Sequence, residues 1–164
     1  MALQNKKSLG QHWLKDPDVL ADIADAAELT DDDTVLEIGP GLGTLTSRLL
    51  ARAGRVVAVE FDKDLARKLP AQFPGKNLEV INQDILQFDT TKLPQDYKAV
   101  ANVPYYITSK IIQLLSESPN PPKTMVLLVQ KEVAERLAAG PGDYSVLAVA
   151  AQVYYRVELA AIVP

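Results

Sequence analysis

TVLEIGPGLGT, residues 34–44, is the stretch that decides the fold. An apolar run with the composition of a buried strand leads into a loop that has glycine at every second position, at Gly39, Gly41 and Gly43. Glycine adopts backbone conformations that other residues avoid, and a loop with so little side-chain bulk lets a ligand lie against backbone amides. The spacing is G-x-G-x-G, not the G-x-G-x-x-G of dinucleotide folds. We therefore expect a different nucleoside-like ligand.

An acidic residue follows the next apolar run. Glu60 comes directly after RVVAV, residues 55–59, and 21 positions after Gly39. At the tip of a second strand such a carboxylate accepts hydrogen bonds from both hydroxyls of a ribose. Alone, each feature favours the plainer interpretation, a tight strand-to-helix turn followed by an exposed glutamate, but together they indicate a ribose-bearing cofactor.

Composition limits the remaining possibilities. The 164 residues suffice for one compact domain, and they include no cysteine and a single histidine, so we expect no disulfide and no metal site. No stretch approaches the ~20 apolar residues of a membrane span, and the first ten residues lack the apolar core of a leader, so we expect a cytoplasmic protein with no membrane partner. The net charge of −4 gives no general support to nucleic-acid binding, which would need a local basic patch.

Strand and helix patterns alternate along the chain. After an ordered arm (1–15), a helix beginning at Asp16-Pro17 and a solvated turn of three aspartates (31–33), strands are predicted at 35–38, 56–59, 78–82, 98–102 and 125–129. Helices are predicted from near Thr44, over 62–69, 109–116 and 131–139, and near 144–152, with a last strand at 154–163. This alternation predicts an open, doubly wound α/β sheet. The continuously apolar run 125–129 is typical of a central strand covered on both faces.

Chemistry-bearing residues follow several of these strands. In such a sheet the ligand lies at the carboxyl ends of the strands, so we expect the glycine loop, Glu60, Asp84 and Asn102 to meet in one crevice. NVPYY, residues 102–106, adds a proline turn and two aromatic rings. The Asn102 side-chain oxygen and a neighbouring carbonyl would accept the two N–H bonds of an exocyclic amine, and Tyr105 would stack on its base. The alternative is that both tyrosines only pack beside a proline turn.

Six motifs carry a family resemblance across nearly the whole chain: KKSLGQHWL, VLEIGPGLGTLT, VVAVEFD, INQDIL, NVPYYIT and VQKEVAERL. The chain resembles the N-terminal catalytic domain of the KsgA family of ribosomal RNA adenine dimethyltransferases. The resemblance implies a Rossmann-like sheet of the class I S-adenosylmethionine-dependent methyltransferase type over residues 1–164, with S-adenosyl-L-methionine as cofactor. It also implies dimethylation of two adjacent adenines near the 3′ end of small-subunit (16S-type) rRNA in a pre-ribosomal particle.

The resemblance also implies roles for single residues. Gln11 and His12 would help to hold the methyl donor, and Gly39 and Gly41 would lie along its methionine portion. Glu60 would bind its ribose, and Asp84 would receive its adenine amine with Ile85 alongside. The implied cofactor-binding set is Gln11, His12, Gly39, Gly41, Glu60, Asp84, Ile85 and Asn102, and the implied catalytic set is Asn102, Pro104 and Tyr105.

The chain departs from the family pattern in two places. His12 and Trp13 stand where the family usually has Asn and then Phe, so we expect an altered, pH-sensitive contact with the donor. The sequence ends at Pro164, where the family continues into a final strand and a small helical domain. We therefore expect strand 125–129 to have an unpaired apolar edge that favours self-association, unless residues 154–163 fold beside it.

Other functions remain open from the sequence. The chain is either an active methyltransferase or a non-catalytic protein, meaning a cofactor-binding fragment or a ribosome-assembly factor, and the intact NVPYY motif favours activity. NVPYYIT and the residues from 129 to 147 resemble the small-subunit enzymes more than the Erm-type enzymes, which methylate a large-subunit adenine. An NAD-dependent oxidoreductase is disfavoured because the third glycine of the dinucleotide motif is absent.

Overall fold

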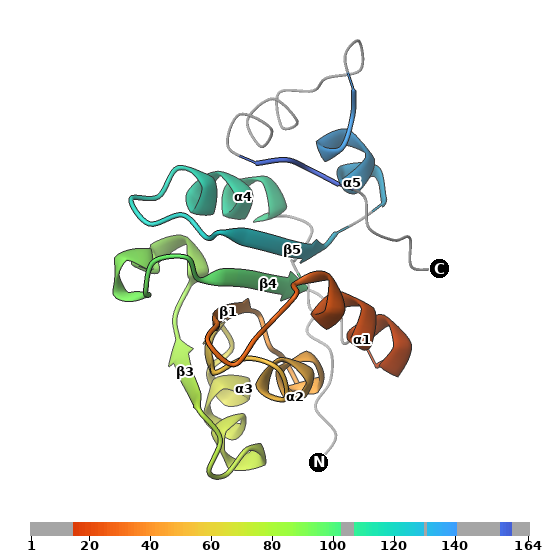
Figure 1. The fold of residues 1–164 in the computed structure, drawn as a ribbon. Helices are drawn as coiled ribbons and strands as arrows, with labels where there is room; N and C mark the ends of the chain where they lie inside the picture. Colours follow the sequence, from red (N-terminus) through yellow and green to blue (C-terminus); the bar gives the residue numbers. More distant parts are fainter. Residues whose placement is uncertain (1–14, 103–106, 130, 141–154, 159–164) are drawn as a thin grey trace.

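The computed structural model describes residues 15–102, 107–129, 131–140 and 155–158. Parallel strands alternate with helices along these residues, as the sequence predicts (Figure 1). The strands are β1 (Thr34–Ile38), β2 (Arg55–Glu60), β3 (Leu78–Asn82), β4 (Lys98–Asn102) and β5 (Thr124–Leu128). The α-helices are α1 (Pro17–Ala26), α2 (Thr44–Leu50), α3 (Lys63–Lys68), α4 (Thr108–Ser116) and α5 (Lys131–Leu137), and short 3₁₀ turns are η2 (Pro70–Gln72), η3 (Ile85–Gln87) and η4 (Thr90–Lys92).

The sheet has the order β3-β2-β1-β4-β5, and every neighbouring pair is parallel. The chain therefore moves outward from β1 to β3 and then returns to the other side of β1, which is the doubly wound arrangement. The register pairs Ile38 with Val59 and with Ala101, and Glu60 with Asn82. The carboxyl ends of β1 to β4 consequently lie at one edge of the sheet, where a ligand is expected.

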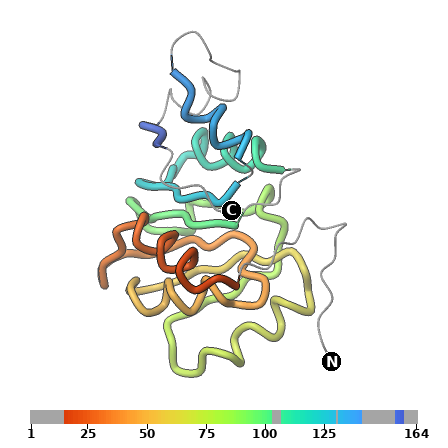
Figure 2. The backbone as a smooth tube through the Cα atoms, turned by 90° about the vertical axis from the view of Figure 1, so that its right-hand side faces the viewer, coloured from red at the N-terminus to blue at the C-terminus, as the bar shows by residue number. Residues whose placement is uncertain are grey.

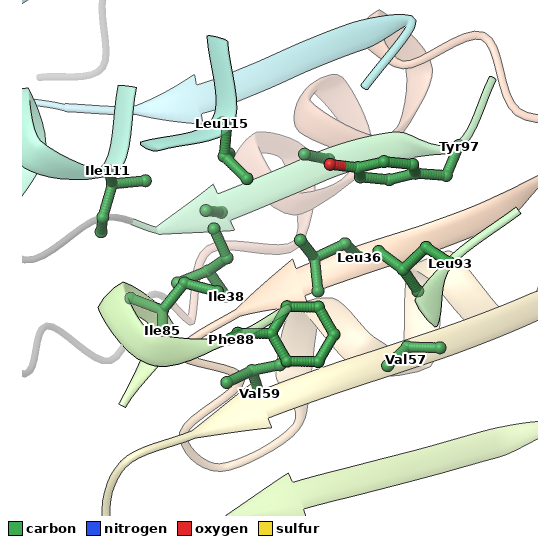
Figure 3. Close-up of a cluster of buried hydrophobic side chains, with 12 residues drawn as sticks. Leu36, Ile38, Val57, Val59, Ile85, Phe88, Leu93, Tyr97, Ile111 and Leu115 are labelled. Carbon is green, nitrogen blue, oxygen red and sulfur yellow. The ribbon is translucent and has the colours of Figure 1, made fainter. Parts of the chain in front are cut away.

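Two hydrophobic layers enclose the sheet because alternate residues of each strand point to opposite faces. On one face Leu36, Ile38 and residues of β2 and β4 pack against Ile111 and Leu115 of α4 and against Phe88, Leu93 and Tyr97 (Figure 3). On the other face Val35, Val56 and Val100 pack against buried residues of α1 and α2. The view turned by 90° places α4 and α5 at the opposite end of the molecule from the β3 edge (Figure 2).

Aspartates begin two of the helices. The Asp16 carboxylate accepts hydrogen bonds from the backbone N–H groups of Asp18 and Val19, with Pro17 at the first helical position. Asp62 accepts from Asp64 and Leu65 in the same way. These caps satisfy backbone donors that a helix leaves unpaired at its first turn, so both predicted helix starts are confirmed.

The structure corrects three expectations. β5 is the last strand of the described sheet and its residues are only partly buried, so it is not covered like a central strand. Asp33 is not merely solvated, because its carboxylate lies 3.2 Å from Lys98 Nζ in a mostly buried ion pair. Residues 155–158, the described part of the predicted last strand, form no strand. The helix predicted near 144–152 and the arm before Lys15 lie outside the described residues.

Candidate cofactor site

The glycine loop turns sharply at the end of β1. Gly39, Gly41 and Gly43 have φ values of 67°, 58° and 86°, in the left-handed region that favours glycine. The Gly39 N–H donates to the Val59 carbonyl at 3.0 Å, which fixes the loop to β2. A side chain at Gly39 would have as its nearest neighbour the Asn102 carbonyl, at 3.8 Å. The loop therefore lies between the tips of β2 and β4, as the parallel sheet predicts.

Gly43 has a packing role that Gly39 lacks. It is the N-cap of α2, and a Cβ atom there would lie 2.7 Å from Leu69 Cδ1 and 3.2 Å from Phe73. Both side chains belong to the segment that follows α3. The third glycine of this motif thus makes room for the segment that follows α3, although its spacing differs from that of the dinucleotide fold.

Glu60 joins two loops at the centre of the site. Its side chain is buried, with Oε2 accepting from the Gly41 N–H at 3.0 Å and Oε1 accepting from the Asp62 N–H at 3.0 Å. Burial raises the pKa of Glu60, and the two backbone hydrogen bonds oppose that rise. A carboxylate has about four acceptor sites, so each oxygen retains capacity for a ligand hydroxyl.

Glu37 is a buried acid that the sequence reasoning missed. It lies in the middle of the apolar strand β1, is 1% exposed, and its Oε2 accepts from the Thr46 hydroxyl at 2.6 Å. Its Oε1 is buried without a hydrogen-bond partner among the described residues. Burial raises the pKa of Glu37 to about 8, and the charge of Glu60 contributes to the rise. The signal in the sequence is a charged residue within a strand that is otherwise apolar on both faces.

Asp84 and Ile85 follow β3, whose last residue pairs with Glu60. The Asp84 carboxylate accepts from the Leu86 N–H at 3.0 Å and so begins η3, which leaves most of its acceptor capacity unused. The Ile85 side chain is buried in the core beside α4, as Figure 3 shows. Contact between Ile85 and a ligand would therefore involve its backbone.

Asn102 is the last residue of β4, and its carbonyl faces Gly39. The structure thus brings together Gly39, Gly41, Glu60, Asp84 and Asn102 at one edge of the sheet. The other predicted site residues, Gln11, His12, Pro104 and Tyr105, lie outside the described residues.

Two further residues at this edge were missed from the sequence. Phe61, directly after Glu60, is 60% exposed, and no other large hydrophobic residue of the described chain is exposed. Asn82, at the end of β3, donates from Nδ2 to the carbonyls of Glu60 and Phe61 at 2.9 and 3.1 Å. A solvent-exposed aromatic ring beside polar strand ends suits a planar ligand. The only sequence signal for either residue is its place at a strand end.

Metal and membrane features are absent from the part of the chain that the structure describes. There, no group of three or more His, Cys, Asp or Glu side chains could hold a metal ion. No helix among the same residues is long and apolar enough to span a membrane.

Comparison with known proteins agrees with this geometry. The family model described as ribosomal RNA adenine dimethylase matches residues 2–164. Ribosomal RNA small subunit methyltransferase A of Dehalococcoides mccartyi (strain CBDB1) is 45% identical over 166 residues, covering 99% of this chain and 57% of the relative. This chain therefore spans a little over half of that relative's length.

Solved structures give the same assignment of the fold. A dimethyladenosine transferase from Plasmodium falciparum is 35% identical with a TM-score of 0.77, over 87% of this chain and 52% of that one. The 23S rRNA methyltransferase ErmE is 36% identical with a TM-score of 0.75, over 84% of this chain and 56% of that one. The fold is that of the class I S-adenosylmethionine-dependent methyltransferases. With a family model that matches almost every residue, this chain belongs to the ribosomal RNA adenine dimethylase family.

Proposed function

We propose that this chain binds S-adenosyl-L-methionine and transfers its methyl groups to the exocyclic amines of adjacent adenines near the 3′ end of small-subunit rRNA. The observation that carries the proposal is the buried carboxyl group of Glu60, which accepts hydrogen bonds from the Gly41 and Asp62 N–H groups beside the glycine loop and keeps lone pairs for two ribose hydroxyls. The spacing of the glycines, which is not that of the dinucleotide fold, disfavours NAD.

The contacts of the site suit such a cofactor. Glu60 would accept from the ribose hydroxyls with the lone pairs that Gly41 and Asp62 leave unused. Asp84 would accept from the adenine amine, with the backbone of Ile85 alongside. Gly39 and Gly41 would lie along the methionine portion, where little side-chain bulk stands in the way. We assign Gln11 and His12 to the same ligand on family resemblance alone.

The target adenine would bind at Asn102, Pro104 and Tyr105. The cofactor supplies an electrophilic methyl group. An exocyclic amine is a poor nucleophile because its lone pair is delocalised into the ring. The Asn102 side-chain oxygen and a neighbouring carbonyl would accept its two N–H bonds and stabilise the positive charge that develops on nitrogen. Tyr105 would stack on the base, which must be unpaired or flipped to enter the site.

The substrate follows from the family and from the relatives named above. The curated relatives are named ribosomal RNA small subunit methyltransferase A. This name favours small-subunit rRNA as the substrate over the large-subunit rRNA of ErmE, and we propose that the substrate is part of a pre-ribosomal particle. We accordingly place the protein in the cytoplasm. Residues 1–164 would form the cofactor-binding methyltransferase domain.

Calorimetric titration with S-adenosylmethionine tests the cofactor site. We expect saturable binding that is weakened in Glu60→Ala and in Asp84→Ala, and no competition by NAD. Thr91→Ala, which removes a hydroxyl from η4 on the surface, is the matched control and should bind like wild type. If the folded protein binds no S-adenosylmethionine, the proposed function is wrong.

Methylation of under-methylated small subunits tests the reaction. Asn102→Ala should abolish methyl transfer and leave particle binding largely intact, because the acceptor for the amine is lost. An Asn102→Ala variant that still methylates would show that the target pocket lies elsewhere.

A non-catalytic role is the second candidate. It is favoured by the net charge of −4, which gives no general attraction for RNA. In that case the titration would succeed while methyl transfer by the wild-type chain would fail.

Self-association through the edge of β5 is a separate proposal about partners. Residues 124–128 are only partly buried along the last described strand of the sheet. A monomer in light scattering at high protein concentration would refute it.

A further inference from the structure

We infer that Asn82, a residue outside the predicted site, positions the Glu60 carboxylate for recognition of the cofactor ribose. This inference deepens the proposed function and rests on it. Asn82 is the last residue of β3 and lies opposite Glu60 in the parallel pairing of β2 and β3. It is therefore the neighbour of Glu60 across the sheet, at the edge where the ligand would bind.

The Asn82 side chain contacts the backbone carbonyls of two successive residues, Glu60 and Phe61. Its Nδ2 donates to the Glu60 carbonyl at 2.9 Å and to the Phe61 carbonyl at 3.1 Å. The Gln83 N–H also donates to the Glu60 carbonyl, at 3.1 Å. The chain leaving β2 is thus held by the end of β3 at two successive carbonyl groups.

One peptide group links Asn82 to the carboxylate itself. The Phe61 carbonyl and the Asp62 N–H belong to the same planar peptide unit. Asn82 binds the carbonyl of that unit, and Glu60 Oε1 accepts from its N–H at 3.0 Å. Because the unit is rigid, rotation that freed the carbonyl would also turn the N–H away from Glu60. Asn82 therefore fixes the donor that orients one oxygen of the carboxylate.

The other oxygen is oriented from the glycine loop. Glu60 Oε2 accepts from the Gly41 N–H at 3.0 Å, so the carboxylate is held from two independent loops. A carboxylate aligned in this way presents its remaining lone pairs in one direction, which favours simultaneous acceptance from two neighbouring hydroxyls. Loss of the Asn82 contacts would loosen one of the two supports and leave the Gly41 contact in place.

Asn77 provides a matched control at the other end of the same strand. Its Nδ2 donates to the Gly54 carbonyl at 2.8 Å, so it also ties the backbone beside β2 from an exposed asparagine next to β3. This contact lies at the amino end of the sheet, away from the proposed ligand. Asn77→Ala should therefore change stability in the same sense as Asn82→Ala without changing ligand binding.

The experiment is a calorimetric binding cycle with S-adenosylhomocysteine on wild type, Asn82→Ala, Glu60→Ala and the double variant. We expect Asn82→Ala to weaken binding roughly tenfold, the equivalent of about one net hydrogen bond. Asn77→Ala should bind within about twofold of wild type. In the Glu60→Ala background the Asn82 substitution should have no further effect, because Asn82 acts through that carboxylate.

A second measurement uses the 2′-deoxy analogue of S-adenosylhomocysteine. Wild type should prefer the ribose form, and Asn82→Ala should lose most of that preference, which a general loss of stability would not cause. The inference is overturned if Asn82→Ala binds like wild type, keeps its preference for the ribose, or weakens binding equally when Glu60 is absent. If folded wild type binds neither compound, the proposed function fails and this inference fails with it.

Discussion

The substitution Glu37→Gln removes the fully buried carboxyl group of β1 and keeps the shape of the side chain. Burial raises the pKa of Glu37 from 4.5 to about 8. Between these pH values the folded protein holds a proton that the unfolded chain releases. The free energy of unfolding of wild type must therefore fall as the pH rises through this window, whereas the contribution of a glutamine stays constant.

The magnitude follows from the shift. A pKa displacement of this size, at ~1.4 kcal/mol per unit, corresponds to about 5 kcal/mol between the two ends of the window. Over the two units from about pH 5.5 to about pH 7.5, wild type should lose about 3 kcal/mol relative to Glu37→Gln. At the acidic end the two proteins should have similar stability, because the Glu37 carboxyl is then neutral.

Urea denaturation of both proteins at several pH values measures this difference. Glu132→Gln, in the exposed first turn of α5, controls for the loss of a surface carboxylate and should follow wild type. Thr46→Val should extend the decline to higher pH, because the Thr46 hydroxyl bond lowers the pKa of Glu37. Parallel pH curves for wild type and Glu37→Gln would refute the reasoning, since they would mean that Glu37 binds its proton equally in both states.

Three further substitutions test the packing that supports the site. Gly54→Ala should destabilise the fold by roughly 3 kcal/mol or more in thermal unfolding, because the added Cβ would collide with the Asp31 carbonyl; a wild-type melting temperature would contradict the geometry. Lys98→Met should cost about 3 kcal/mol in urea denaturation, because it leaves Asp33 partly buried without its cation, and an unchanged midpoint would show that the pair is not needed. The difference between the two proteins should shrink on acidification: burial alone would raise the pKa of Asp33, but hydrogen bonds and the Lys98 charge bring it below its ordinary value, so the stability that the pair gives wild type is lost as Asp33 is protonated. Asp96→Gly should raise the free energy of unfolding by up to about 1 kcal/mol, because Asp96 has a φ of 61°; a lower value would refute the assignment of strain there.

Much of the fold could be predicted because its signals are local. β3 and β4 have the predicted bounds, and the glycine loop, the Asp62 cap and the parallel alternation follow from residues close together in the sequence. The position of β5 could not be predicted in this way. An apolar run fits an edge strand or a central strand equally well, and the number of its neighbours depends on distant segments. The Lys98–Asp33 pair, which joins residues 65 positions apart, was missed for the same reason.

The same contrast between local signals and distant contacts applies to the candidate site. The convergence of Gly39, Glu60, Asp84 and Asn102 follows from the rule that parallel strands present their carboxyl ends at one edge. The contacts of Glu60 with Gly41 and Asp62 could not be read from spacing, because they depend on how two loops fold toward one carboxylate. Glu37 is perturbed because β1 is covered on both faces, and this burial becomes apparent only when the whole sheet is assembled.

The different surroundings of the glycines bear on how natural variants of this loop should be interpreted. A side chain at Gly43 would displace the buried Leu69 side chain and would have to adopt a φ of 86°, so a chain that had lost every trace of catalysis would still be more stable with glycine there. Gly39 has no such steric demand, since the nearest atom to its missing side chain is at ordinary contact distance, and only its positive φ and the approaching ligand restrict it. Among diverging copies of this domain, replacement at Gly39 with retention of Gly43 would therefore mark a lineage that kept the scaffold after selection for the ligand had ended.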